Sequence, residues 1–232
     1  IGVIVALVAL LFVFTKMPEL ESEEESKSNI TIGSLLKRKH LVLGILAQFL
    51  NLGAQVSLWG NFVDLKLDLA KNDNLWLVEK IYQISDLMSP TQIASFHASF
   101  AFIIFLLGRF LGTYLMGTIA SNKVLGVYAI GSVISVIIAM FGGGLAALIA
   151  LIAVYFFQSI MFPTIFALSC KGLGEGKKLA SSLIIMSIVG GAIIPPLTAS
   201  LFKVSTVAAL SIPLVCFTYI IYYAYKGYEI KD

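Results

Sequence analysis

Hydrophobic and polar positions alternate along this chain in long blocks rather than in the short periods of a soluble domain. Six apolar runs follow one another at about 40–63, 92–119, 123–141, 145–170, 179–202 and 206–226, separated by shorter polar segments. Most of these runs reach the roughly 20 residues that a helix needs to cross the hydrocarbon core of a bilayer. Because lipid offers no partners to backbone N–H and C=O groups, we predict that all six are transmembrane helices.

Shorter segments surround these six runs. Residues 1–15 are mostly apolar, but the run is too short for a span and lacks the basic start of a signal peptide. We interpret it as the end of a truncated transmembrane helix that begins upstream of Ile1. Residues 16–39 are expected to form a charged linker, residues 64–91 a polar outer loop and residues 227–232 a short tail. Residues 40–226 would then form one six-helix transmembrane bundle.

The composition supports a membrane protein and excludes several other classes. Hydrophobic residues make up 59% of the chain and charged residues 12%, whereas soluble domains contain about 25% charged residues. The net charge of +3 is small and the basic residues lie in short loops, so nucleic-acid binding is not indicated. The sequence shows neither the His, Cys, Asp and Glu spacing of a metal site nor a nucleotide-binding loop. We therefore expect no enzyme activity, no metal and no cofactor.

The basic residues also predict the orientation in the membrane. Alternate polar segments form two sets, one containing the 16–39 linker and the C-terminal tail, the other containing the 64–91 loop. Eleven basic residues lie in the first set and four in the second: Lys16, Lys27, Lys37, Arg38, Lys39, Lys123, Lys171, Lys177, Lys178, Lys226 and Lys231 against Lys66, Lys71, Lys80 and Lys203. Since cytoplasmic loops are rich in Lys and Arg, we expect a multi-pass protein of the bacterial inner (plasma) membrane with a cytoplasmic linker and C-terminus.

Arg109 is the only ionisable residue deep in an apolar run, apart from His97 near an outer end. A guanidinium inside the bilayer costs at least about 2.5–3.5 kcal/mol, so it must face a cavity or a partner. One interpretation is that Arg109 lines a transport cavity together with Phe105, which lies one turn earlier on nearly the same face. The other is that Arg109 bonds carbonyl groups at the C-terminal end of a helix. In the same run, Gly108 and Gly112 form a GxxxG pair, which favours close helix packing.

A stripe of amides runs along the first complete span. Gln48, Asn51, Gln55 and Trp59 fall within an arc of about 80° at 100° per residue. Amides suit sugar hydroxyls because they both donate and accept hydrogen bonds, and an indole ring offers its face to sugar C–H groups. These four residues are therefore candidate sugar contacts. Hydrogen bonding between helices is the alternative role for the amides.

The spans 145–170 and 179–202 contain prolines. The first also carries a second polar and aromatic stripe, from which we take Gln158 and Phe162 as candidate sugar contacts; its members are Tyr155, Gln158, Phe162 and Ser169. Proline lacks an N–H and clashes with the preceding turn, so both helices are expected to kink. The candidate hinge residues are Pro163, Gly190, Gly191, Pro195 and Pro196. Glycine pairs also serve plain packing, which is the alternative for the two glycines.

Five segments together resemble a known family. In order they are AQFLNLGAQVSLW (47–59), GRFLGTYL (108–115), NKVL (122–125), FPTIFALSCKGLG (162–174) and SSLIIMSIVGGAIIPP (181–196). They are similar to the fucose permease family of sugar:proton symporters in the major facilitator superfamily. The resemblance covers nearly the whole chain from about residue 40. It corresponds to the C-terminal six helices of that family, preceded by the end of helix 6.

This resemblance implies one half of an all-α, twelve-helix transporter with a central sugar site and alternating access. It implies that Arg109 and Phe105 line the cavity and that Gln48 and Gln55 match glutamines of the family. Phe162 stands where the fucose permease has tyrosine, so one hydroxyl is lost. The family places its proton-coupling carboxylates in the N-terminal half, and the predicted spans of this chain contain no Asp or Glu. The expected partners are thus a sugar, a proton, the missing N-terminal half and membrane lipid.

Three functions follow from these observations. The first is transport of fucose or a related hexose by proton symport. The second is a major facilitator carrier of another small solute, such as an organic anion or a drug, in which Arg109 would bind a carboxylate directly. The third is a membrane scaffold, or a channel built from short helical subunits, which would need no second half. The polar stripes and Arg109 favour the first.

Overall fold

The structure is a computed structural model that describes residues 31–72 and 89–230. The helices described below belong to one compact unit, Thr31–Asp232. Four of the segments expected above lie wholly or partly outside the described residues. They are the helix end at 1–15, residues 16–30 of the linker, residues 73–88 of the outer loop and the last two residues of the tail.

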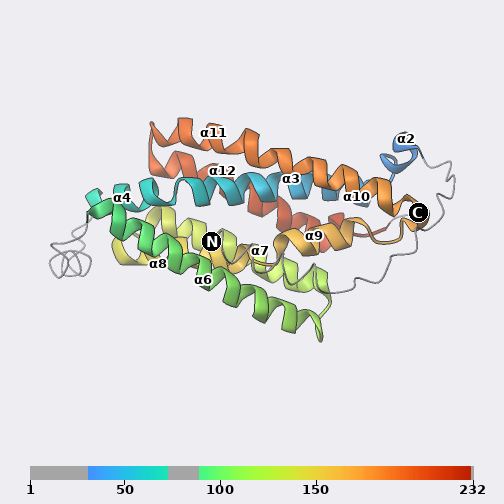
Figure 1. Cartoon of the computed structure of the whole chain (residues 1–232), viewed down its shortest axis with the longest axis horizontal. Coiled ribbons are helices and arrows are strands. Elements are labelled where there is room, and N and C mark those ends of the chain that lie inside the picture. The colour runs from blue at the N-terminus through green and yellow to red at the C-terminus, as the bar shows by residue number, and fades with distance from the viewer. Residues whose placement is uncertain (1–30, 73–88, 231–232) are drawn as a thin grey trace, which may run out of the picture. The chain divides into compact units, whose positions relative to one another are not determined.

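Six spans within the described residues are long and apolar enough to cross a membrane, which confirms the all-α architecture expected from the sequence (Figure 1). Three are continuous helices: α3 (Lys39–Gly60), α6 (Pro90–Met116) and α7 (Ser121–Phe141). The fourth consists of α8 (Gly144–Gln158) and α9 (Met161–Ser169). The fifth consists of η1 (Gly174–Gly176), α10 (Lys177–Met186), η2 (Ser187–Val189) and α11 (Gly190–Phe202). The sixth is α12 (Thr206–Tyr222), followed by the π-helix η3 (Tyr223–Gly227).

Two shorter helices flank the first span, α2 (Ile32–Leu35) before it and α4 (Phe62–Asn72) after it. The start of the segment expected as a polar loop, 64–91, is therefore helical. Phe62 and Leu65 explain this, because both are almost fully buried and give α4 an apolar face. The Thr206 hydroxyl donates a hydrogen bond to the Asp68 carboxylate, which ties α4 to the first turn of α12.

Local signals fix the ends of several helices and keep the turns short. Ser89 and Gln92 form a capping box at the start of α6, in which Ser89 Oγ accepts from the Gln92 N–H at 3.3 Å and Gln92 Oε1 accepts from the Ser89 N–H at 2.7 Å. Ser205 caps α12 by accepting from the Ala208 N–H at 3.0 Å. The turn between α7 and α8 requires a φ of 60° at Gly143, which favours glycine. Short turns of this kind make consecutive spans antiparallel.

Helix α3 packs against α11, α12 and α9. Three contacts, four residues apart on each helix, join α3 to α11: Phe49–Gly190, Gly53–Ile194 and Ser57–Thr198. Each pair is separated by the same 141 residues, so α3 and α11 run parallel in one register. A glycine in each of the first two pairs lets the backbones approach closely. Gly190, a candidate hinge residue, thus packs directly on α3.

Helix α3 runs antiparallel to α8 and α9. Near its start, Gly44 lies against the Ser169 side chain of α9, and near its end the Trp59 ring stacks on Tyr155 of α8. At the first of these contacts Ser169 Oγ and the Tyr223 hydroxyl form a buried hydrogen bond of 2.8 Å. This pair holds α9 and the end of the sixth span together.

Replacing Tyr223 by phenylalanine is expected to lower the free energy of unfolding by about 0.6 kcal/mol, the average for a hydrogen bond between membrane helices. Only the hydroxyl is lost, so the ring packing is preserved. Thermal unfolding of the detergent-solubilised protein would measure this, with Tyr114→Phe as control because Tyr114 is 75% exposed. Equal stability losses in the two variants would contradict a stabilising role for the Ser169–Tyr223 bond.

The fourth and fifth spans are both interrupted, and each interruption lies upstream of the prolines in that span. The break between α8 and α9 falls at Ser159–Ile160, ahead of Pro163. In the fifth span, η2 interrupts the α-helix, whereas Pro195 and Pro196 lie inside α11. The break at Ser159–Ile160 fits the rule that a proline disturbs the turn before it, whereas η2 ends six residues ahead of Pro195 and is not explained by that rule. Whether these sites act as hinges remains a prediction.

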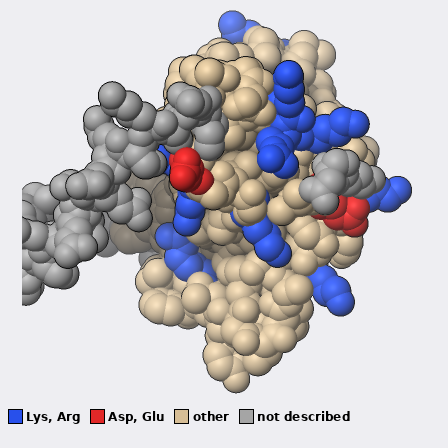
Figure 2. Space-filling model, turned by 90° about the vertical axis from the view of Figure 1, so that its right-hand side faces the viewer, with Lys and Arg blue, Asp and Glu red and all other residues tan. Residues whose placement is uncertain are grey.

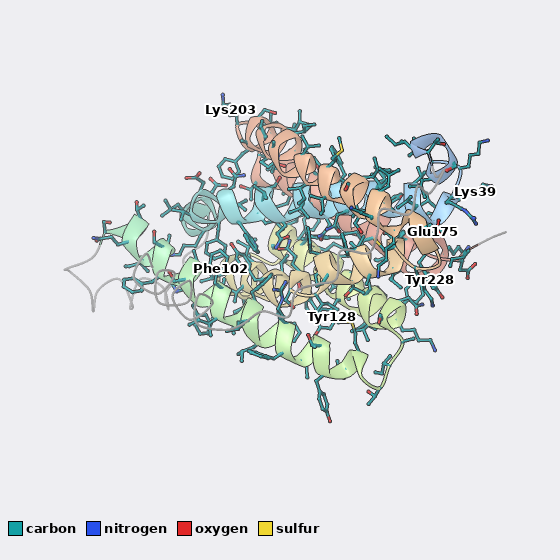
Figure 3. The ribbon with its side chains drawn as sticks, turned by 45° about the vertical axis from the view of Figure 1, so that its right-hand side comes forward. Lys39, Phe102, Tyr128, Glu175, Lys203 and Tyr228 are labelled. Carbon is teal, nitrogen blue, oxygen red and sulfur yellow. The ribbon has the colours of Figure 1, made fainter. Side chains whose placement is uncertain are left out.

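Basic residues gather at one end of the bundle, where α3, α7 and α10 begin and the sixth span ends. They are Lys37, Arg38, Lys39, Lys123, Lys171, Lys177, Lys178 and Lys226. Figure 2 shows the molecule from this end, and Lys and Arg predominate there over Asp and Glu. Lys39 and Lys203 mark opposite ends in Figure 3. This charge asymmetry is the one on which the predicted orientation rests.

Candidate functional site

An aromatic cluster forms where α3, α6 and α8 meet. The rings of Trp59 and Tyr155 stack with their centroids 5.7 Å apart. Phe102 and Phe105 of α6 meet the Trp59 ring edge-on, at centroid distances of 4.9 and 5.4 Å. Tyr155 is buried, whereas Trp59 and Phe105 are half-buried and Phe102, labelled in Figure 3, is exposed. The cluster therefore extends from the interior of the bundle to the surface of α6.

The polar stripe of α3 faces the interior of the bundle. Gln48 and Asn51 have no exposed surface, and Gln55 is 8% exposed. The antiparallel register of α3 against α8 and α9 brings Gln55 opposite Gln158, the last residue of α8, which is 1% exposed. Amides from two helices that are far apart in the sequence thus occupy the same interior region.

Several polar atoms in this region have no hydrogen-bond partner among the described residues. They are both side-chain polar atoms of Gln48, Asn51 and Gln158, the hydroxyls of Tyr155 and Ser132, and Trp59 Nε1. An unpaired buried group costs about 1–3 kcal/mol, so each one requires an explanation. Amides and hydroxyls supply both donors and acceptors, and the indole supplies a donor. A polyhydroxy ligand or ordered water would satisfy such a set.

Arg109 lies at the exposed edge of this region, on α6. Its Nε donates a hydrogen bond to the Ser159 carbonyl at 3.1 Å, and its guanidinium carbon lies 5.3 Å from the centroid of the Phe105 ring. Ser159 is the residue that ends α8. The second interpretation of Arg109, a bond to a carbonyl at a helix C-terminus, is thus confirmed for this contact. A direct contact with a solute remains a prediction.

The other candidate residues lie around the two interrupted spans. Phe162 is half-buried and Pro163 is exposed, both in the first turn of α9. Gly190 and Gly191 pack on α3, while Pro195 and Pro196 lie one turn further along α11. The structure thus brings Trp59, Phe105 and Tyr155 together at the junction of α3, α6 and α8, with Arg109 beside the Phe105 ring. Of the amides, Gln55 and Gln158 lie nearest this junction, whereas the same register places Gln48 and Asn51 further along α3, opposite α9. The fifth span contributes packing on the other side of α3.

Two residues of this region were not singled out from the sequence. Phe102 sits in a continuous apolar run, where nothing distinguishes a ring that stacks from one that meets lipid. Ser132 of α7 is fully buried, and the sequence did carry a sign of it. Ser132 lies three residues before Ser135, and residues 124–141 are otherwise apolar residues and glycine. Small polar residues at helical spacing would have identified this face of α7.

Comparison with known proteins gives a consistent result, although no family model matches the chain. A protein of Helicobacter pylori (strain J99 / ATCC 700824), named for glucose/galactose transport, is 37% identical over 232 residues, covering 97% of this chain and 52% of that protein. The L-fucose-proton symporter of Escherichia coli (strain K12) is 34% identical over 231 residues, covering 95% of this chain and 48% of the symporter. The chain therefore spans about half the length of the relatives it matches.

A solved structure has the same arrangement of helices. A crystal structure of a variant of the E. coli fucose:proton symporter FucP is 33% identical and superposes with a TM-score of 0.75. The match covers 96% of this chain and 52% of the symporter chain. Sequence and helix arrangement therefore agree that the chain belongs to the fucose permease and glucose/galactose transporter family of the major facilitator superfamily.

Proposed function

We propose that this chain forms the C-terminal half of a secondary transporter that carries fucose or a related hexose by proton symport and alternating access. The observation that supports this best is the set of unpaired amide, hydroxyl and indole atoms in the interior, on Gln48, Asn51, Gln158, Tyr155 and Trp59. These groups match the hydroxyls of a sugar, and the Trp59 ring would meet its C–H face. The relatives named for fucose, glucose and galactose support the same class of solute.

The proposed partner is an N-terminal six-helix half, which would cover α6. This helix lies at one edge of the bundle in Figure 1. Its exposed residues are mostly large and apolar: Phe96, Phe100, Phe102, Ile103, Leu106, Leu107, Phe110, Leu111 and Tyr114. Lipid covers the remaining apolar surface. The six described spans contain one acidic residue, Glu175 at the entry turn of the fifth, so the carboxylate that couples transport to protons is assigned to the other half.

The proposed orientation places the basic end of the bundle in the cytoplasm of a bacterial cell. The excess of Lys and Arg at that end supports this assignment. The described side chains of the other end include Lys66 and Lys203 together with Asp64 and Asp68. Residue-specific labelling from either side of the membrane, at Lys39→Cys and Lys203→Cys, would test the orientation.

The second candidate function, transport of a small organic anion, is favoured by one observation. Arg109 is exposed and uses Nε for the Ser159 carbonyl, and a guanidinium has further N–H donors that suit a carboxylate. Competition experiments separate the two functions. Neutral hexoses would inhibit uptake by a sugar carrier, whereas small carboxylates would inhibit uptake by an anion carrier.

The decisive experiment measures uptake of labelled fucose, glucose and galactose by the complete transporter in membrane vesicles. We expect concentrative uptake of at least one hexose when the outside is acidic, and loss of accumulation when a protonophore collapses the gradient. Equilibration without accumulation would retain sugar transport but contradict proton coupling. If none of the hexoses enters and none competes, the proposed solute class is wrong.

A further inference from the structure

At the break between α8 and α9, the Ser159 carbonyl has no helical N–H partner. In a continuous α-helix the Ser159 carbonyl would accept from the N–H of residue 163. That residue is proline, which has no N–H. The carbonyl next to it is bonded normally, because Ile160 accepts from the Thr164 N–H at 3.1 Å. Among the carbonyls at this break, only that of Ser159 loses its helical donor to a proline, and Ser159 directly follows Gln158.

Arg109 supplies the donor that Pro163 lacks. Its Nε lies 3.1 Å from the Ser159 carbonyl oxygen. Arginine suits this position because its guanidinium stays charged and presents donors in a rigid plane, and a hydrogen bond from a charged group is stronger than a neutral one. One side chain of α6 thus replaces one backbone hydrogen bond of the fourth span.

The two glycines beside Arg109 bring α6 close enough for this contact. A Cβ on Gly108 would overlap the Phe156 carbonyl, and a Cβ on Gly112 would overlap the Ile160 side chain. The GxxxG pair therefore faces the segment 156–160, where α8 ends. Its packing role and the position of Arg109 are parts of the same contact.

Helix α7 secures α6 at the same level. The Tyr128 hydroxyl donates to the Gly108 carbonyl at 3.1 Å (Tyr128 is labelled in Figure 3). The Ser159 hydroxyl donates to the Phe156 carbonyl at 2.7 Å, which closes the last turn of α8. We refer to these contacts of Gly108, Arg109, Tyr128, Phe156 and Ser159 as the α6–α8 joint.

We propose that Arg109 is a positioning residue: its guanidinium takes the place of the N–H absent at Pro163 and thereby fixes the break that presents Gln158 and Phe162 to the solute. The inference depends on the proposed function only in that the solute is taken to be a sugar. Gln158 immediately precedes the bonded carbonyl, and Phe162 lies in the first turn beyond the break. A shift of the joint would therefore move both predicted contacts together.

A double-mutant cycle between Arg109 and Pro163 in the complete transporter tests this proposal. Alanine at position 163 restores an N–H that can bond the Ser159 carbonyl. We expect Arg109→Ala alone to raise the KM for the transported sugar about tenfold, as for loss of one charge-assisted hydrogen bond. In the Pro163→Ala background the same change should alter the KM less than about twofold. Arg109→Lys should resemble Arg109→Ala, because lysine lacks the planar Nε donor.

Thermal unfolding of the purified variants provides a second readout that does not depend on the solute. Arg109→Ala should lower the melting temperature when Pro163 is present and leave it nearly unchanged in the Pro163→Ala background. Lys123→Ala controls for loss of an exposed cation, and Pro213→Ala, inside α12, controls for removal of a proline. Neither control should show coupling to Arg109.

Three outcomes would overturn the proposal. Equal KM losses in both backgrounds would make Arg109 a direct ligand. Rescue of the melting temperature without rescue of the KM would leave the joint as a stabilising contact that does not position the site. Equal losses of melting temperature in both backgrounds would mean that Pro163 and Arg109 are independent. If the complete protein carries no sugar, the proposed function fails, whereas the unfolding cycle still tests the joint.

Discussion

Replacing Gln158 by leucine is expected to make the protein more resistant to heat while lowering its transport of sugar. The side chain is 1% exposed, and neither its amide nitrogen nor its oxygen has a partner among the described residues. Removing an unpaired buried amide relieves a penalty of about 1–3 kcal/mol, and leucine has a similar volume. If the amide bonds a sugar hydroxyl during transport, its loss should raise the KM up to about tenfold.

The expected gain in thermal stability and the expected loss of transport have opposite signs, so a general defect in folding would not reproduce both. Thermal unfolding and hexose uptake would be measured on the same preparation of the complete transporter. Thr218→Val is a suitable control, because Thr218 is exposed on α12 and its hydroxyl bonds only the Leu214 carbonyl of its own helix among the described contacts. Higher stability with unchanged uptake would show that Gln158 is a packing defect rather than a sugar contact. Lower stability would mean that the amide has a partner in the membrane-embedded protein.

Asn51→Leu would show whether this behaviour belongs to the whole interior stripe. Asn51 has no exposed surface, and its two amide atoms are likewise unpaired among the described residues. A transporter must keep polar groups ready for a solute that is present only part of the time. Stability lost at such positions is the expected cost of function.

The sequence was sufficient to predict the transmembrane spans, but not to predict which spans pack against one another. Block length and hydropathy depend on the residues of each helix alone, so the expected run 206–226 agrees closely with the observed span Thr206–Gly227. Helical periodicity likewise put Gln48, Asn51 and Gln55 on one face. It could not say which helix that face meets, because this depends on the register between α3 and α8, more than 80 residues away. The interior location of the amides was therefore visible only in the structure.

Arg109 illustrates the same limit at the level of one side chain. Its position in an apolar run showed that it needs a partner, and both a cavity and a helix end were considered. The Ser159 carbonyl lies 50 residues further along the chain. A local clue existed nonetheless: Pro163 deprives the carbonyl four residues before it of a donor, so Ser159 had to find one elsewhere. Searching for donors to such carbonyls would have paired the two helices from the sequence.

Replacing Gly190 by alanine is expected to have the largest effect on the fold. A Cβ at this position would overlap the backbone carbonyl of Phe49, which cannot rotate away as a side chain can. The helices α3 and α11 would have to separate, and overpacking of this kind costs about 1–3 kcal/mol or more. The register that joins Gly53 to Ile194 and Ser57 to Thr198 would be disturbed with it. We expect a clear drop in melting temperature and transport reduced about tenfold or more.

Two comparisons show whether this loss comes from the backbone clash. Gly60→Ala adds the same methyl group to the last residue of α3, where nothing lies within 4 Å of the new Cβ, so it should be neutral or slightly stabilising. Gly53→Ala would instead meet the Ile194 side chain, so Ile194→Ala should restore much of its stability. No side-chain change at Phe49 should rescue Gly190→Ala, because the obstacle is a peptide carbonyl. Rescue by Phe49→Ala, or equal behaviour of Gly190→Ala and Gly60→Ala, would disprove the close parallel contact between α3 and α11.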